Sequence, residues 1–318
     1  MRAYLIRRLL LLIPTMFILT AIVFLAVRFI PGDIVDLIAD AMWWEGGVID
    51  EDLVRQMMGL DVPVHVQYGR WIGDILLRGS FGESLFGGWP IGERIAGRLP
   101  VSIQLGVMAI VIGLVIALPV GIYSAVRQDT AADYVGRTAA VIGMATPNFW
   151  LGMMVMLYPA IWWGWSPPVE LIKFKQDPLG NLGMFFIPAL ILGTAMSAAT
   201  MRMTRTMMLE VLRQDYIRTA WSKGLKERVV IIRHATKNAF IPVLTLIGMQ
   251  LPLLIGGSVI LEEIFVLPGI GRLFIEALDF RDYPVVSAIN LILASAVLLS
   301  ALLIDMLYPY FDPRIRYQ

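Results

Sequence analysis

Six long runs of uncharged, mostly apolar residues dominate this chain. They cover residues 9–27, 99–126, 138–169, 178–201, 238–261 and 283–304. Each run is long enough to cross about 30 Å of hydrocarbon as an α-helix, which takes about 20 residues. With 58% hydrophobic residues and a mean hydropathy of +0.73, the chain of 318 residues lies far from the composition of soluble domains. We therefore expect an all-α polytopic membrane protein with six transmembrane helices.

Lys and Arg residues gather in four segments that border these runs. The segments precede the first run, follow the second, separate the fourth from the fifth and close the chain; they contain Arg2, Arg7, Arg8, Arg127, Arg137, Arg202, Arg205, Arg213, Arg218, Lys223, Lys226, Arg228, Arg233, Lys237, Arg314 and Arg316. Loops rich in Lys and Arg stay in the cytoplasm under the positive-inside rule. Both ends of the chain are predicted on that side, because six crossings return the chain to the face where it began. The net charge of +1 gives no indication of nucleic-acid binding.

The runs divide the chain into four predicted parts. Residues 1–28 form a cytoplasmic N-terminus and the first helix, 29–98 a small helical extracytoplasmic insertion, 99–305 the permeation core, and 306–318 a cytoplasmic tail. The first run is interpreted as a retained helix, because it is longer than the apolar region of a signal peptide. Inside the insertion, Pro63 and Gly79 predict the start and the end of a helix.

The residues required for several kinds of chemistry are missing or misplaced. With no Cys and only two His, we expect neither a disulfide framework nor a metal site. The phosphate-binding pattern G-x-x-x-x-G-K-[ST] does not occur, so ATP must be handled by another chain. His65 and His234 lie outside the apolar runs, where neither could act as a base within the membrane. We therefore predict that this chain has no catalytic residue, metal or cofactor of its own.

The loop over residues 202–240 is the most informative polar segment. Residues 216–225 have the sequence YIRTAWSKGL, and residues 233–242 have the sequence RHATKNAFIP. Ala220 suits a short helix, and Gly224 can end or bend that helix. The second stretch predicts a basic helix that leads to Pro242 at the membrane. We expect this loop to bind a soluble partner.

In order and spacing, the loop resembles the coupling motif, or EAA loop, of ABC-importer permeases, in the form found in the peptide and nickel branch. Further likeness lies in FIPGD at 29–33, ATPNFWLG at 145–152, FVLPGIGRL at 265–273, RDYPVV at 281–286 and LYPYFDPRIRY at 307–317. Nearly the whole chain thus resembles the B-type permease subunits for dipeptides and oligopeptides. Arg218, Thr219 and Ala220 replace the acidic residue and two alanines of the generic motif, which removes support for a salt bridge from that position.

The resemblance implies a permease subunit of an ATP-driven importer in the inner or plasma membrane of a bacterium or archaeon. The implied partners are a second permease, either a paralogue or the same chain, two ATPase subunits that bind ATP and Mg, and an extracytoplasmic substrate-binding protein. Di- or oligopeptides are the implied cargo, with nickel, another small solute or glycan fragments as alternatives. The residues implied in contact with the ATPases are Tyr216, Arg218, Thr219, Ala220, Lys223, Gly224, Leu225, Arg233, His234, Asn238 and Pro242.

An ion-coupled secondary transporter is the alternative from another class. Such proteins commonly place Asp, Glu, His or Arg inside the helix bundle as a relay or counter-ion. The six runs contain none of these residues, which disfavours this alternative. Polar candidates for a pathway remain, although most such residues only join helices by hydrogen bonds; they are Asn148, Gln250, Ser258 and Asn290.

Gly and Pro residues recur inside the runs. Gly113, Gly121 and Gly193 are examples. Small residues in membrane helices let two backbones approach closely. We expect packing, rather than a kink that borders a pathway, at most of these positions.

Overall fold

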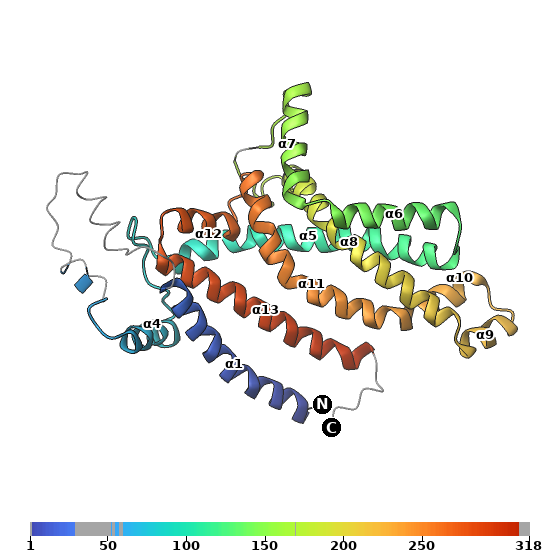
Figure 1. Ribbon diagram of the computed structural model, residues 1–318, viewed down its shortest axis with the longest axis horizontal. Helices are drawn as coiled ribbons and strands as arrows, with labels where there is room; N and C mark the ends of the chain where they lie inside the picture. Colours follow the sequence, from blue (N-terminus) through green and yellow to red (C-terminus); the bar gives the residue numbers. More distant parts are fainter. Residues whose placement is uncertain (1, 29–51, 53–54, 57–59, 169, 312–318) are drawn as a thin grey trace. The chain divides into compact units, whose positions relative to one another are not determined.

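The computed structural model describes residues 2–28, 52, 55–56, 60–168 and 170–311. Within these ranges the regular elements are helices, and one isolated antiparallel bridge joins Glu83 and Pro90. The helices, labelled in Figure 1, are α1 (Arg2–Arg28), α4 (Val64–Arg78), α5 (Ile91–Val126), α6 (Ala131–Ala145), α7 (Asn148–Trp163), α8 (Pro178–Leu212), α9 (Asp215–Ser222), α10 (Glu227–Val229), the π-helix η1 (Val230–Thr236), α11 (Lys237–Ile264), α12 (Ile270–Asp279) and α13 (Tyr283–Phe311).

Five helices of the described residues are long and apolar enough to cross a membrane, and a sixth crossing results if α6 and α7 are counted as one span. This agrees with the six predicted transmembrane helices. The third run, however, contains parts of two helices, α6 and α7, which meet at an angle of 91°. Thr146 between them is extended, with φ −88° and ψ 120°, because a residue that precedes proline avoids the α-helical region. Pro147 therefore breaks the third span.

The chain divides into two compact units. Unit 1 contains residues 99–272 and 296–311, and unit 2 contains the described residues of 2–98 together with 273–295. In unit 1, α6 and α11 pack on α8, and α9 and α10 follow at one end of α8 (Figure 1). That end carries the loop that the sequence singles out.

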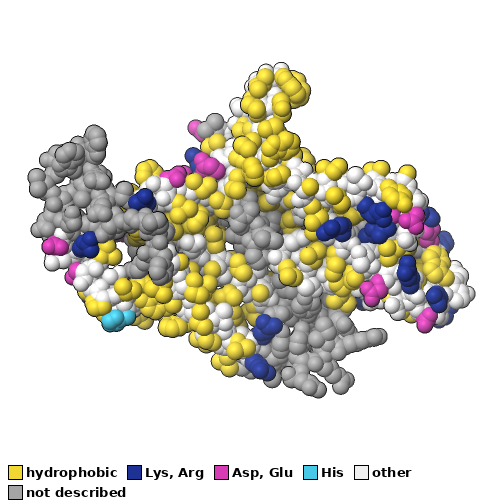
Figure 2. Space-filling view, in the orientation of Figure 1, with side chains coloured by type: hydrophobic (Ala, Val, Ile, Leu, Met, Phe, Trp, Pro, Cys, Tyr) yellow, Lys and Arg dark blue, Asp and Glu magenta, His cyan; other side chains and the backbone are white. Residues whose placement is uncertain are grey.

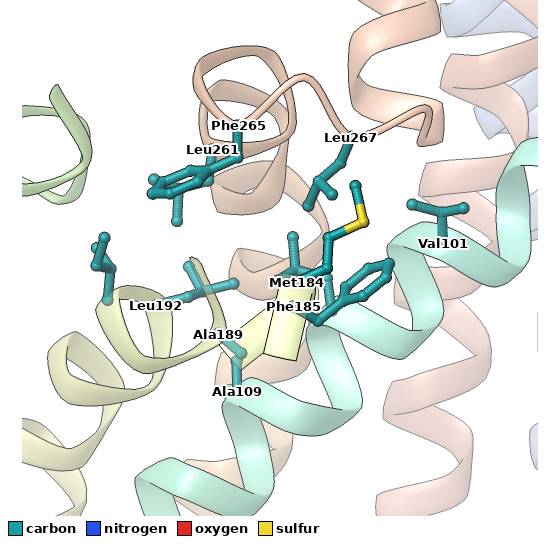
Figure 3. Close-up of a cluster of buried hydrophobic side chains, with 11 residues drawn as sticks. Val101, Ala109, Met184, Phe185, Ala189, Leu192, Leu261, Phe265 and Leu267 are labelled. Carbon is teal, nitrogen blue, oxygen red and sulfur yellow. The ribbon is translucent and has the colours of Figure 1, made fainter. Parts of the chain in front are cut away.

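A cluster of buried apolar side chains holds unit 1 together. Figure 3 shows how side chains of α5, α8 and the end of α11 point toward one another. The buried members are Val101, Leu105, Ala109, Met184, Phe185, Ala189, Ile191, Leu192, Leu261, Phe265 and Leu267. Since lipid tails are as apolar as these side chains, close van der Waals packing rather than the hydrophobic effect stabilises such a cluster in a membrane.

Glycines bring the backbones of α5 and α8 into contact. A Cβ atom on Gly193 would lie 2.6 Å from the carbonyl oxygen of Ala109, and one on Gly113 would lie 3.0 Å from the carbonyl oxygen of Gly193. At Gly121 it would lie 2.8 Å from both the Met201 oxygen and a Thr204 carbon. The predicted packing role of these three glycines is confirmed.

In unit 2, α4 packs on α1 through aromatic side chains. The hydroxyls of Tyr68 and Thr20 lie 2.7 Å apart, and the Tyr68 ring meets the Phe24 ring edge-on at 5.3 Å. The helix begins after Pro63 and ends at Gly79, whose φ of +64° is left-handed. Both predicted boundaries of this helix are confirmed.

Candidate functional site

The stretch from residue 213 to residue 238 connects α8 to α11, and we call it the basic segment. Its first helix, α9, buries Ile217 and Ala220, which lie three residues apart on one face. They pack against Met208 of α8, which is fully buried. The same cluster includes Ala125, Val230, Ala235 and Ala239. The basic segment is therefore anchored on α5, α8 and α11 by an apolar face.

Gly224 closes the turn after α9. Its φ of +75° is left-handed, and nothing lies within 4 Å of the position where a Cβ would stand. The N–H of Gly224 donates to the Trp221 carbonyl at 2.9 Å, and that of Leu225 donates to the Ala220 carbonyl at 3.4 Å. Because only glycine adopts this backbone conformation at little cost, the turn depends on this residue.

The second half of the basic segment continues into the membrane helix without a break. The π-helix η1 joins α10 to α11, and Pro242 lies inside α11 rather than at its start. The predicted basic helix before Pro242 is thus the continuous stretch of α10, η1 and the first residues of α11. Asn238, at the start of α11, donates from Nδ2 to the Tyr216 hydroxyl at 2.7 Å, which ties the two halves of the segment together.

The outer face of the basic segment is cationic and partly aromatic. Lys and Arg side chains gather over the end of unit 1 that carries α9 and α10 (Figure 2). Of the predicted contact residues, Ala220 is buried, His234 and Pro242 are half-buried, and the others are exposed: Tyr216, Arg218, Thr219, Lys223, Gly224, Leu225, Arg233 and Asn238. Trp221, which the sequence argument did not select, is 44% exposed on the same segment.

A buried ion pair lies beside the basic segment, and the sequence argument missed it. Asp133 in α6 is fully buried and receives two hydrogen bonds from Arg205 of α8, from Nε to Oδ1 at 2.9 Å and from Nη2 to Oδ2 at 2.8 Å. The Ser124 hydroxyl of α5 donates to the same carboxylate. We call Ser124, Asp133 and Arg205 the ion-pair clamp. Arg205 had been assigned to a loop, because the uncharged run ends at residue 201, but α8 continues to Leu212.

A second buried carboxylate, Glu262, lies one residue beyond the fifth run. Its Oε2 accepts the N–H groups of Gly271 at 2.7 Å and Arg272 at 3.3 Å, at the start of α12. The Ser102 hydroxyl accepts the neighbouring N–H of Ile270 at 2.9 Å. These bonds satisfy donors that a helix N-terminus leaves unpaired. Glu262 therefore anchors the start of α12.

The four polar candidates for a pathway lie on three helices, α7, α11 and α13. The Gln250 carbonyl oxygen accepts the Thr200 hydroxyl at 3.3 Å, so this buried residue joins α11 to α8. Ser258 is buried in α11, and Asn148 is half-buried at the start of α7. Asn290 belongs to unit 2, so the structure does not place it against the other three.

With five or six candidate crossings among its described residues, the protein belongs to the class of multi-pass helical membrane proteins. A solved structure described as "Crystal structure of an amino acid ABC transporter with histidines" has the same fold, with a TM-score of 0.54 at 14% identity over 69% of this chain and 94% of that one. Residues 117–317 match the family model for the binding-protein-dependent transport system inner membrane component, and residues 1–106 match the model for its N-terminal part. The chain belongs to this family of ABC-importer permeases.

Curated relatives are similar over the full chain. The oligopeptide transport system permease protein AppB of Bacillus subtilis (strain 168) is 38% identical, with 100% of both chains covered. The glutathione transport system permease protein GsiC of Salmonella paratyphi A is 38% identical, with 99% of both chains covered. The predicted resemblance to peptide-type permeases is confirmed.

Proposed function

We propose that this chain forms part of the translocation pathway of an importer for di- or oligopeptides. The observation that carries the proposal is the 38% identity, over 99–100% of both chains, to permeases described for oligopeptides and for glutathione. Glutathione is itself a small peptide, so both relatives point to cargo with a peptide backbone.

We also propose that the basic segment is the surface on which the ATPase subunits dock. Its buried face, with Ile217 and Ala220, is already occupied within this chain, which leaves the opposite face for a partner. The exposed residues of α9 are the aromatic side chains of Tyr216 and Trp221, one at each edge of the buried face, and the guanidinium of Arg218 farther round the helix. Tyr, Trp and Arg are the residues that contribute most to protein–protein affinity. Lys223 and Arg233 add positive charge that would steer an acidic partner.

Membership of the family supports a proposal for the remaining partners. We propose that a second permease, most simply a paralogue, completes the pathway, and that a substrate-binding protein delivers cargo from outside. Two ATPase subunits would bind ATP and Mg on the cytoplasmic side. The basic segment and both termini of this chain would lie on the same side of the membrane. In this arrangement we propose a cytoplasmic N-terminus and first helix for residues 1–28 and an extracytoplasmic position for residues 29–98. Residues 99–305 would form the membrane core, and residues 306–318 would form a cytoplasmic tail.

Purification of the native complex through a tag on this chain tests the proposal. We expect ATPase subunits, a second permease and a binding protein to copurify, and mass spectrometry of the binding protein to detect peptides. Reconstituted complex should take up those peptides only when ATP can be hydrolysed. A complex without ATPase subunits would contradict the proposed function, whereas nickel or another solute on the binding protein would contradict the cargo alone.

A further inference from the structure

The ion-pair clamp lies directly beside the residues on which the basic segment rests. Ser124 precedes Ala125 in α5, and Arg205 stands about one helical turn before Met208 in α8. Ala125 and Met208 belong to the cluster that buries the inner face of α9. A displacement of α9 therefore acts on the same stretches of α5 and α8 that the clamp joins to α6.

Beyond the clamp, α6 meets α8 through small residues. A Cβ on Gly136 would come within 3.3 Å of the Met201 side chain, and one on Gly143 within 3.8 Å of Ala198. An open groove of about 730 Å³ lies between α5, α6 and α8 along this contact. Apolar contacts of this kind are not directional.

The clamp supplies the directional contact that these surfaces lack. A bidentate pair between Arg and a carboxylate fixes both the distance and the orientation of its partners. The N–H of Asp129, in the turn between α5 and α6, donates to Asp133 Oδ2 at 3.1 Å, so the turn is held as well. The carboxylate thus joins α5, the turn, α6 and α8 at one point.

We propose that Asp133 and Arg205 are positioning residues that make α6 move together with α8 and the basic segment during transport. The inference rests on the proposed function, in which ATPases act on the basic segment. The pair touches neither ATP nor cargo; it transmits a rigid-body displacement from the docking surface to α6. Stability alone is a poor reason to retain such a pair, because apolar side chains of similar volume often stabilise a protein interior as well or better.

The test measures peptide uptake and ATP hydrolysis on the same proteoliposomes, which contain the whole transporter and a binding protein loaded with a labelled oligopeptide library. Asp133→Asn removes the charge and keeps the shape, and Arg205→Lys keeps the charge but loses the bidentate geometry. We expect both variants to retain their ATPases and to hydrolyse ATP, while the peptide transported per ATP falls by about tenfold. The matched control is Arg137→Gln on α6, which removes the contact of the Arg137 guanidinium with the Tyr134 ring of the same helix, 4.7 Å from the ring centroid, and should leave that ratio unchanged.

The outcomes separate this inference from the proposed function. An unchanged ratio in both clamp variants overturns the inference, and so does an equal fall in uptake and hydrolysis, or a failure of both variants to assemble, because each would show a purely structural role. An equal loss of the ratio in Arg137→Gln would also overturn it, since the effect would not be specific to the clamp. A parental complex without ATP-dependent uptake would remove the proposed function and this inference together.

Discussion

Single glycines decide how closely α5 and α8 approach each other. Apolar side chains gain little by leaving lipid for the interior of a membrane protein, so backbone-to-backbone proximity supplies much of the packing energy. At Gly193 this proximity is extreme, because the carbonyl oxygen of Ala109 occupies the space where a side chain would begin. Gly183 of the same helix is exposed, with nothing within 4 Å of its Cβ position. The two positions form a matched pair.

Gly193→Ala should destabilise the protein, and Gly183→Ala should not. An added methyl group at Gly193 forces the two helices apart, at a cost of about 1–3 kcal/mol. The same substitution at Gly183 meets no neighbour and improves helix propensity by about 0.5–1 kcal/mol. Thermal unfolding of the purified protein in detergent checks this prediction. Equal melting temperatures for the two variants would show that the α5–α8 contact is not as close as described.

At the scale of elements, the basic segment is an assembly of short helices held by one face. Its turn depends on Gly224, and its two halves are joined by the hydrogen bond between Asn238 and Tyr216. The surface of such a segment keeps its shape only if the residue in the turn can adopt the left-handed backbone conformation. A change at this turn should therefore alter docking without affecting the membrane helices.

Gly224→Val should reduce both ATPase retention and uptake, whereas Gly224→Asn should preserve them. A β-branched residue in a left-handed conformation costs about 1–3 kcal/mol, while Asn visits that conformation readily. Since the space around Gly224 is open, the side chain itself causes no clash. Pull-down of the ATPase subunits from membranes with equal amounts of each variant measures the effect. Normal retention in Gly224→Val would argue against docking through this segment.

At the scale of the whole molecule, the buried ionisable groups described above are committed to structural bonds. Asp133 and Arg205 bind each other, and Glu262 binds backbone N–H groups of the turn into α12. A proton relay needs groups that can exchange their partners during transport. The placement of these groups thus favours an energy source outside this chain.

Uptake should persist when an ionophore collapses the proton gradient and ATP is maintained. In the converse experiment, ATP depletion with an intact gradient should abolish uptake. Both conditions are measured on proteoliposomes with an ATP-regenerating system or an ATP-consuming system inside. Loss of uptake with the ionophore alone would support the ion-coupled alternative, in which intramembrane acids act as relays.

Much of the fold and part of the candidate site could be predicted from residue patterns. The length of the apolar runs determined the helices, because an unpaired backbone polar group is too costly in lipid. Pro63 and Gly79 marked the ends of α4, since their backbone preferences are local. The spacing of residues within the loop 202–240 indicated the family, which full-length similarity confirmed.

Only the tertiary structure decided how polar residues from distant runs are paired. The sequence shows that Asp133 and Arg205 are charged, but the bond between them depends on the packing of α6 on α8. Because the uncharged run ends at residue 201, the sequence pattern also does not show that α8 continues to Leu212. The hydrogen bond from Thr200 to Gln250 likewise forms only because α8 and α11 pack together. Sequence patterns determine local backbone and membrane insertion, because these depend on neighbouring residues alone. The pairing of buried polar groups depends on which helices meet, and that is a property of the folded chain.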